Sequence, residues 1–299
     1  MQKFAKMSPN NSFFLQSNFF VGIIISSLLL FSQCKKEETA TTPANNSTTT
    51  DPVKYDFSPF YAGLIFVSSN CNGCYYSQPP HDAMMAATDS ARKKFLLHYH
   101  ILGFPPGGFP EDPVGTYEYK TLWDDFCATV AHNKYTPMVS ARGAGSTTFI
   151  YTGQKVKEMN KYVDSCFTFI PEHAIYIELT SAPNDLTKIT GKYSIKNKLM
   201  QYDLADVQIR FALTEDSIKF NATKGENAGR AQIINHAVRA DMAITPDASG
   251  EGVFEMTGIP SNAKVANCTL VAFVETNKGT PSKINWGKIK AASSIDLVK

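Results

Sequence analysis

The stretch Ala62-Gly63-Leu64-Ile65-Phe66-Val67-Ser68-Ser69-Asn70-Cys71-Asn72-Gly73-Cys74 decides the fold of this chain. Its section from Leu64 to Val67 joins branched and aromatic residues and ends at a Ser-Ser-Asn break, which predicts a buried strand. The residues after Cys74 lack a strand pattern and lead into Met84-Met85-Ala86-Ala87, which predicts a helix. A CxxC pair between a strand and a helix places a helix N-terminus against a thiol, where it can lower the thiol pKa.

Two prolines extend the pattern around the thiols. Pro79 lies five residues after Cys74, where thioredoxins carry the proline that kinks their first helix. Thr136-Pro137, just before the apolar Met138-Val139, looks like the cis-proline loop that faces the CxxC in that fold. The chain therefore resembles thioredoxin-like proteins. Asn72-Gly73 replaces their usual Gly-Pro, so their redox potential is not carried over.

The N-terminus has the pattern of an export signal. Lys3 and Lys6 precede an apolar stretch from Phe19 to Phe31, which suits a signal peptide and is too short to span a bilayer. It ends at Leu30-Phe31-Ser32-Gln33-Cys34, which resembles a relaxed bacterial lipobox. We therefore expect residues 1–34 to be a lipoprotein signal peptide, with Cys34 as the lipidated residue. An ordinary secretory signal cleaved nearby is the alternative.

Residues 35–53 are predicted to form a disordered tether. After the charged run Lys35-Lys36-Glu37-Glu38, the segment from Thr39 to Asp51 consists almost entirely of Thr, Ala, Asn, Ser and Pro. Such a segment buries too little apolar surface to offset chain entropy. The charged run resembles surface-export signals of some Gram-negative lipoproteins, and a tether facing the periplasm is the alternative. Either way, the expected location is the cell envelope, on the outer membrane.

Composition and the motif search exclude several other classes of protein. The chain has 299 residues and a formal net charge of +2, with scattered basic residues, so no nucleic-acid partner is expected. No later apolar segment approaches the length of a transmembrane helix. About 245 residues remain after the tether, enough for two modest domains or one large one. No GxSxG, HExxH or GxGxxG motif stands in a convincing context, so neither a hydrolase nor a cofactor is predicted.

The pattern of hydrophobicity changes midway along the chain. In the first part, strand and helix patterns alternate, with a second buried strand over Phe95–Leu102 and a helix over Tyr119–Ala131. In the second part, short segments alternate apolar and polar residues, as in Val207–Leu213. We therefore predict an α/β thioredoxin-like domain over residues 54–170, followed by an all-β sandwich domain over residues 171–299.

Motifs in the second part sharpen the resemblance. Lys224–Arg230 and Asn235–Arg239 look like the hallmark of a secreted thioredoxin-like bacterial family of unknown function, related to outer-membrane lipoproteins of Gram-negative bacteria. Tyr135–Pro137 and Leu270–Val274 also fit that family, and the likeness covers roughly Tyr61 to Ala292. The resemblance implies an N-terminal CxxC domain joined to a C-terminal β-domain. It implies no settled activity.

The residues of Lys224–Arg230 can also be interpreted without the resemblance. The segment lacks the GxxxxGK[ST] spacing of a phosphate loop and is flanked by strand patterns. We therefore expect a turn with Gly and Asn residues in left-handed conformations. Glu226 and Arg230 are expected to form a structural ion pair across it.

Cys71 and Cys74 are the candidate catalytic pair. Because a helix N-terminus lowers the pKa of the first cysteine most, Cys71 would be the nucleophile and Cys74 the resolving thiol. Thr136 and Pro137 would shape a groove for an extended substrate opposite the thiols. A closed, inert disulfide is the alternative. A Cys71 sulfur exposed beside Pro137 favours redox chemistry, whereas a buried pair, or one covered by the loop Pro105–Pro113, favours a structural staple.

His98 and His100 lie on one face of the second strand, because side chains alternate with a period of two. If that strand ends near the CxxC, His100 could tune Cys71 electrostatically, or both histidines could join the thiols in a Cys2His2 metal site. We prefer hydrogen-bonded histidines under a loop. No second CxxC or HxxxH supports zinc, so no metal is predicted.

The remaining cysteines are predicted to be structural. Cys127 and Cys166 fall on apolar faces of predicted helices, as small core residues or as a bridge if those helices touch. Cys268 opens a predicted strand and is expected to pack in the core. The chain has six cysteines including Cys34, so at least one of the other five stays unpaired in a monomer.

Two functions from different classes follow. The first is a thiol-disulfide oxidoreductase that acts on exported thiol proteins through the CxxC pair. The second is a non-catalytic surface or assembly lipoprotein, in which the CxxC is a structural disulfide and the β-domain binds a partner. In both, a lipid anchor makes the outer membrane the first partner of the chain.

Overall fold

The structure is a computed structural model of the chain. It describes residues 55–69, 71–86, 92–102, 112–128, 134–144, 149–152, 156–180, 187–198, 204, 206–276 and 288–298. Asp51–Lys299 forms one compact unit. The predicted signal peptide with Cys34, the tether and most of the Pro105–Pro113 loop lie outside the described residues.

Strands and helices alternate in the first part of this unit, and strands dominate the second. The first elements are β1 (Phe60–Val67), α1 (Asn72–Ala86), β2 (Lys93–His100), α2 (Tyr117–Phe126), β3 (Met138–Arg142), β4 (Phe149–Thr152) and α3 (Val156–Cys166). They are followed by β5 (His173–Leu179), β6 (Ile189–Asn197), β7 (Val207–Glu215), β8 (Ile218–Asn221), β9 (Ala231–Ile234), β10 (Ala237–Ile244), β11 (Glu251–Met256), the 3-10 helix η2 (Val265–Asn267), β12 (Cys268–Thr276) and β13 (Ile289–Asp296). The predicted β-rich character of the second part is confirmed.

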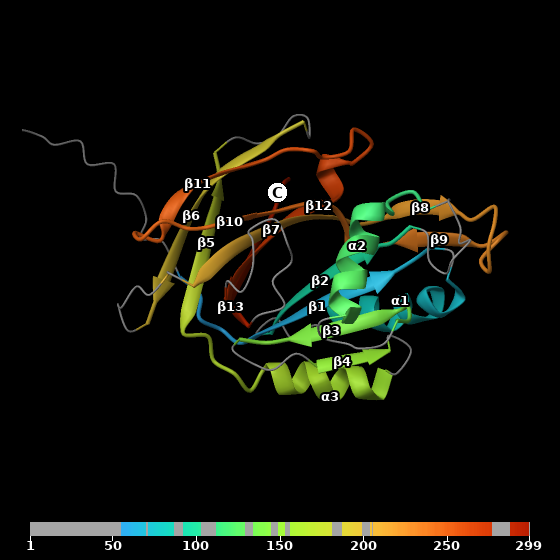
Figure 1. Cartoon of the computed structure of the whole chain (residues 1–299), viewed down its shortest axis with the longest axis horizontal. Helices are drawn as coiled ribbons and strands as arrows, with labels where there is room; N and C mark the ends of the chain where they lie inside the picture. Colours follow the sequence, from blue (N-terminus) through green and yellow to red (C-terminus); the bar gives the residue numbers. More distant parts are fainter. Residues whose placement is uncertain are drawn as a thin grey trace, which may run out of the picture. The chain divides into compact units, whose positions relative to one another are not determined.

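A mixed eight-stranded sheet runs through the whole unit (Figure 1), in the order β13-β12-β7-β10-β2-β1-β3-β4. β1 pairs in parallel with β2 and antiparallel with β3. β10 joins β2 through one parallel residue pair, Ala237 with His98. Strands from both sides of the boundary predicted at residue 170 therefore share one sheet.

A second sheet, in the order β11-β6-β5, packs against the β7-β12-β13 part of the first. Apolar side chains from both sheets meet in one core cluster, with Phe211 stacked on Phe254 at a ring-centroid distance of 4.3 Å. This two-sheet packing follows from the period-two pattern, because each strand turns every second side chain inward. The second part is thus a layered β-structure, continuous with the first part through β10.

Helices cover both faces of the sheet around β1. All eight residues of β1 are buried, because alternate side chains enter different clusters. Phe66 packs with Trp123 of α2 on one face. Ile65 packs on the other face with Cys74 of α1 and Val163 of α3. The run from Leu64 to Val67 is therefore a doubly covered strand, as the continuous apolar pattern predicted.

The structural role predicted for the remaining cysteines is confirmed. Cys127, Cys166 and Cys268 are all buried and free. Cys127 belongs to the core cluster under α2, whereas Cys166 belongs to the cluster between α3 and the opposite face of the sheet. The alternative of a bridge between them is wrong, since they pack on opposite faces.

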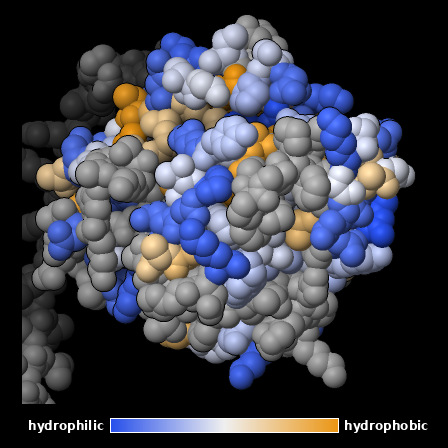
Figure 2. Space-filling model, turned by 45° about the vertical axis from the view of Figure 1, so that its right-hand side comes forward, coloured by the Kyte–Doolittle hydropathy of each residue, from blue (hydrophilic) through white to orange (hydrophobic). Residues whose placement is uncertain are grey.

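Among the described residues on the face seen in Figure 2, hydrophobic residues lie singly or in small groups among hydrophilic ones. Scattered apolar residues of this kind are normal on soluble surfaces and do not by themselves indicate a docking site. None of the helices in the described ranges is long and apolar enough to cross a membrane.

A candidate dithiol site

The two thiols lie at the junction of β1 and α1, in different surroundings. Cys71 directly precedes α1, and its N–H donates to the Ser68 carbonyl at 3.0 Å. Its side chain is half-buried, whereas Cys74 is 5% exposed. The Cys71 Sγ atom accepts a hydrogen bond from the Cys74 N–H at 3.3 Å. The first sulfur therefore faces an N–H of the helix N-terminus, which favours a negative charge there.

The loop before β3 closes over the same sulfur. The Thr136–Pro137 peptide bond is cis, as the resemblance implied. Thr136 Oγ1 donates to Cys71 Sγ at 3.5 Å, and the Thr136 carbonyl oxygen lies 3.7 Å from that sulfur. The pairing of Met138 with Phe66 brings the start of β3 to the end of β1. The antiparallel register of these two strands thus places the proline loop opposite the CxxC.

The contacts give the two thiols opposite acidities. A hydrogen bond from the Cys74 thiol, with further ones from Thr136 and the Cys74 N–H, lowers the pKa of Cys71 to about 6 against the effect of burial. Burial, and then the neighbouring Cys71, raise the pKa of Cys74 well above its ordinary value. At neutral pH, Cys71 is therefore mostly a thiolate and Cys74 a thiol, which are the states of a nucleophile and a resolving group.

The segment Lys224–Arg230, here called the clasp loop, lies directly on the CxxC. Glu226 Oε2 accepts a hydrogen bond from the Asn72 N–H at 2.9 Å. The Asn227 side chain is fully buried and donates to the carbonyl of Ser69 at 2.8 Å and to that of Cys71 at 3.2 Å. A loop more than 150 residues away in sequence therefore fixes the backbone on both sides of the nucleophile.

Arg230 ends the clasp loop and completes its hold on α1. Its Nη1 donates to Asn72 Oδ1 at 2.5 Å and to Asn227 Oδ1 at 3.0 Å. Its guanidinium lies over the ring of Tyr75, 5.2 Å from the centroid, and near that of Tyr76. Such cation–π contacts add about 0.5–1 kcal/mol at exposed sites. Arg230 therefore positions the first turn of the helix.

The predicted chemistry of the clasp loop is partly wrong. Gly225 and Gly229 do adopt left-handed φ values of 82° and 79°, but Asn227 does not. The expected Glu226–Arg230 ion pair is absent, since Glu226 binds the helix N-terminus and Arg230 binds two asparagine side chains. The Glu226 charge opposes ionisation of Cys71 and moderates its low pKa.

Behind the thiols, His100 forms the hydrogen-bonded arrangement that we preferred. His100 Nδ1 lies 2.9 Å from Asp112 Oδ2, and the same oxygen accepts the Ser69 N–H at 2.8 Å. Burial opposes the charge of Asp112, but His100 and the backbone donors hold the pKa of this carboxyl below its usual value. Asp112 was missed from the sequence, because nothing distinguishes it from other loop carboxylates until the fold brings it to the strand end.

His98, in contrast, does not form the side-chain hydrogen bonds that we preferred for both histidines. Both of its ring nitrogens are buried without a hydrogen-bond partner, and its ring lies between those of His81 and His236, at centroid distances of 6.1 and 5.7 Å. Within the described ranges, no three His, Cys, Asp or Glu side chains are arranged to hold a metal ion.

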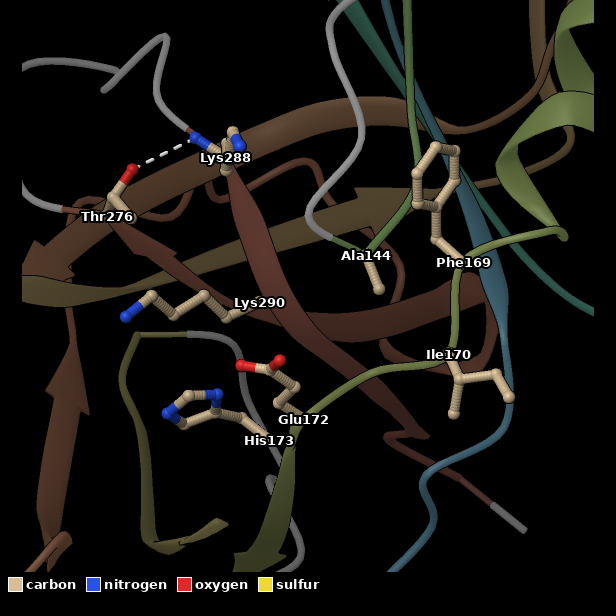
Figure 3. A pocket seen from close by; sticks show the side chains of 8 residues that line it. All are labelled: Ala144, Phe169, Ile170, Glu172, His173, Thr276, Lys288 and Lys290. Atoms are coloured by element: carbon tan, nitrogen blue, oxygen red, sulfur yellow. Dashed lines mark hydrogen bonds between the residues drawn. The ribbon is translucent and has the colours of Figure 1, made fainter. Parts of the chain in front are cut away.

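A pocket with a volume of about 370 Å³ is lined by eight residues (Figure 3). Its lining is Ala144, Phe169, Ile170, Glu172, His173, Thr276, Lys288 and Lys290. Arg142, two residues before Ala144, pairs with Ala62 near the start of β1, whereas the CxxC follows the end of β1. No cysteine is among these lining residues.

Comparisons with known proteins bear on the fold. No protein-family model and no curated protein matches the sequence. Among solved structures, HBP35 of Porphyromonas gingivalis is similar with a TM-score of 0.56 and 16% identity, over 82% of this chain and 77% of that one. The protein AGR_C_4864 from Agrobacterium tumefaciens, a structural genomics target, is similar with a TM-score of 0.50 and 12% identity, over 79% of this chain and 93% of that one. Both are bacterial proteins, and at these identities the likeness concerns the fold alone.

Proposed function

We propose that this chain is an envelope lipoprotein whose first part is a thioredoxin-like module that exchanges disulfides with exported proteins. We also propose that it belongs to the secreted thioredoxin-like family that its motifs resemble. The observation that carries the proposal is the asymmetry of the thiols. A half-buried Cys71 of lowered pKa lies under a cis-proline loop, beside a buried Cys74 of raised pKa.

The exchange proceeds in two steps. The Cys71 thiolate attacks one sulfur of a substrate disulfide, a Cys71–substrate disulfide forms, and the second substrate sulfur leaves with the electron pair and takes a proton. Cys74 then loses its proton and attacks the Cys71 sulfur, which forms the Cys71–Cys74 bond and releases the first substrate sulfur as a thiolate. The substrate gains two electrons and the CxxC pair loses them. The reverse sequence oxidises a dithiol substrate.

The proposed substrate is an extended polypeptide that binds beside Cys71 and the cis-proline loop. Pro137 has no backbone N–H, so the cis-proline loop offers no hydrogen-bond donor at that position. An extended substrate segment could pair with neighbouring backbone groups of the loop while its sulfur approaches Cys71. Tyr76, 57% exposed on the first turns of α1, offers an apolar surface next to this approach.

The first prediction concerns trapped intermediates. Cys74→Ala should accumulate mixed disulfides between Cys71 and envelope proteins, because the resolving thiol is gone. Cys71→Ala should accumulate few or none, because the remaining thiol is buried and of raised pKa. Non-reducing electrophoresis of alkylated cell envelopes, followed by mass spectrometry of the adducts, measures the difference.

Cys127→Ala is the matched control for trapping, since that thiol is buried in the core and should leave the adduct pattern unchanged. Equal absence of adducts in both CxxC variants, together with a pair that alkylates only after denaturation, would reject the oxidoreductase. It would leave the non-catalytic surface or assembly lipoprotein, in which the clasp loop and the CxxC act as a staple.

The second prediction concerns the anchor, which rests on the lipobox-like sequence at Cys34 and the tether after it. Cys34→Ala should move the protein from the membrane fraction to the soluble fraction, since the acyl anchor is its proposed membrane attachment. Metabolic labelling with a palmitate analogue, with Cys268→Ala as the control, reports the modification. A protein that stays membrane-bound as Cys34→Ala, with no label on the unsubstituted chain, contradicts the lipoprotein assignment.

A further inference from the structure

The resolving step poses a problem that the CxxC motif does not solve by itself. Cys74 must lose its proton before it can attack, since the thiolate is the nucleophile. Its side chain is 5% exposed, and burial disfavours the charged sulfur. With 5% exposure, this thiol has little direct contact with bulk water, so a proton acceptor close to Cys74 would favour the resolving step.

A small pocket borders Cys74, and Cys71 is not among the residues that line it. Its volume is about 10 Å³, close to the smallest space that holds one water molecule. Together with Cys74, the pocket is lined by polar side chains that include Ser68, Ser69, Ser77, Gln78, His98, His100 and Gln232. A buried water needs two to four polar partners, and this lining supplies them.

His100 is the group in that lining with a free basic atom. Its side chain is 4% exposed, and its Nδ1 faces the Asp112 carboxylate at 2.9 Å. Because a carboxylate accepts hydrogen bonds, Nδ1 carries the proton in the neutral ring and Nε2 keeps its lone pair. Nε2 is buried and has no hydrogen-bond partner. An imidazole held in this way can accept a proton at Nε2. The carboxylate then stabilises the imidazolium that results.

We propose that His100, oriented by Asp112, takes the proton from Cys74 through one water in this cavity when Cys74 attacks the mixed disulfide. The inference rests on the proposed disulfide exchange and assigns its proton acceptor. The Cys74 S–H donates to the water, and the water donates to His100 Nε2. The Cys74 sulfur bonds to the Cys71 sulfur, and the Cys71–substrate bond breaks with its electron pair on the substrate sulfur. In the reverse reaction, the His100 imidazolium returns the proton to Cys74.

The charges around His100 suit this role. Asp112 supplies the compensating negative charge from the loop before α2. His98 faces the same cavity from β2, and burial lowers its pKa well below the ordinary value, so it stays neutral and adds no competing cation. Cys71, directly before α1, carries a negative charge until it forms the mixed disulfide. The serine and glutamine side chains that also line the pocket are uncharged: Ser68, Ser69, Ser77, Gln78 and Gln232.

The test separates the two steps with a small aromatic disulfide. The full chain, reduced, is mixed with 5,5′-dithiobis(2-nitrobenzoate), which releases one coloured thiolate when Cys71 attacks and a second when Cys74 resolves. His100→Gln should slow the second release about 100-fold or more and leave the first release within about twofold. Asp112→Asn should slow the second release as well, because the imidazolium loses its counter-charge. His173→Gln is the control, as a buried histidine in the lining of the pocket in Figure 3.

Each outcome decides a different claim. An unchanged second release in folded His100→Gln overturns the proton relay while the exchange chemistry stands. Failure of the first release in the unsubstituted chain rejects the proposed function itself. If His100→Gln does not fold, the pH profile of the second release in the unsubstituted chain decides. A rate that levels off within pH 6–9 supports a buried acceptor, whereas a tenfold rise per pH unit throughout overturns it.

Discussion

Acidification from pH 7.5 to pH 4 should lower the free energy of unfolding by about 3 kcal/mol through His81 alone. Burial, with a smaller effect from His236, lowers the pKa of His81 to about 4 from 6.5. The unfolded chain therefore binds this proton first as the pH falls. Stability is complete above pH 6.5 and is lost as the pH falls toward 4. Burial lowers the pKa of His98 in the same direction, so it adds to the loss.

The physical cause is a line of three imidazoles that joins α1, β2 and the residue before β10. His81 and His98 have no hydrogen-bond partner for any ring nitrogen, so nothing compensates a charge there. His236 alone faces carboxylates, with Nδ1 3.2 Å from Asp216 and Nε2 3.9 Å from Asp82. Protonation of His81 or His98 therefore places a cation at a buried site where no hydrogen-bond acceptor compensates it.

Urea denaturation at a series of pH values measures this loss. His81→Gln removes the titrating group and should flatten the dependence of stability on pH between 6.5 and 4 by most of the predicted 3 kcal/mol. His173→Gln, which changes a histidine outside the cluster, should leave most of the slope in place. A slope that is the same in His81→Gln and in the unsubstituted chain contradicts the assignment of the acid sensitivity to this cluster.

Local sequence patterns predicted the elements that carry the nucleophile. The prediction of β1, of α1 and of the order of the thiols rests on residues that are neighbours in sequence. Hydrophobic periodicity and the signals of a helix start are local features that such neighbours reveal. The cis-proline loop was predicted from its resemblance, and the structure places it opposite Cys71 because of the register between β3 and β1. The lowered pKa of Cys71 then follows mainly from the hydrogen bond of the Cys74 thiol, with smaller contributions from Thr136 and the Cys74 N–H.

The contacts that surround the nucleophile could not be predicted in the same way. Asn227, in a loop that follows β8, donates hydrogen bonds to the carbonyls of Ser69 and Cys71. No local sequence pattern predicts a contact between residues so far apart in the chain. The single β10–β2 pair that brings this loop near is likewise invisible to periodicity. The motif at Lys224–Arg230 was identified from the sequence, but its interpretation as a turn predicted an ion pair between Glu226 and Arg230. In the structure, both side chains form hydrogen bonds with Asn72 instead.

Arg210→Met should destabilise the protein by about 3–5 kcal/mol at pH 7, because it leaves two buried carboxylates without their shared cation. Arg210 is 3% exposed, with Nη1 3.1 Å from Asp241 and Nε 3.5 Å from Glu275, which is fully buried. Gln208 donates to the same Glu275 oxygen at 3.0 Å. Methionine fills a similar volume, so the loss measures charge compensation more than packing.

This network also ties the two parts of the sheet together. Tyr99 on β2 donates to Asp241 on β10 at 3.5 Å, at the junction where only one backbone residue pair joins those strands. Chemical denaturation at pH 7 measures the loss, and Arg92→Met, which breaks an exposed pair with Asp164, should cost about 1 kcal/mol or less. Adding Glu275→Gln to Arg210→Met should recover part of the stability, since one uncompensated charge disappears. Equal losses in Arg210→Met and Arg92→Met would mean that the buried carboxylates are already neutral, and the network would then hold the sheet by hydrogen bonds alone.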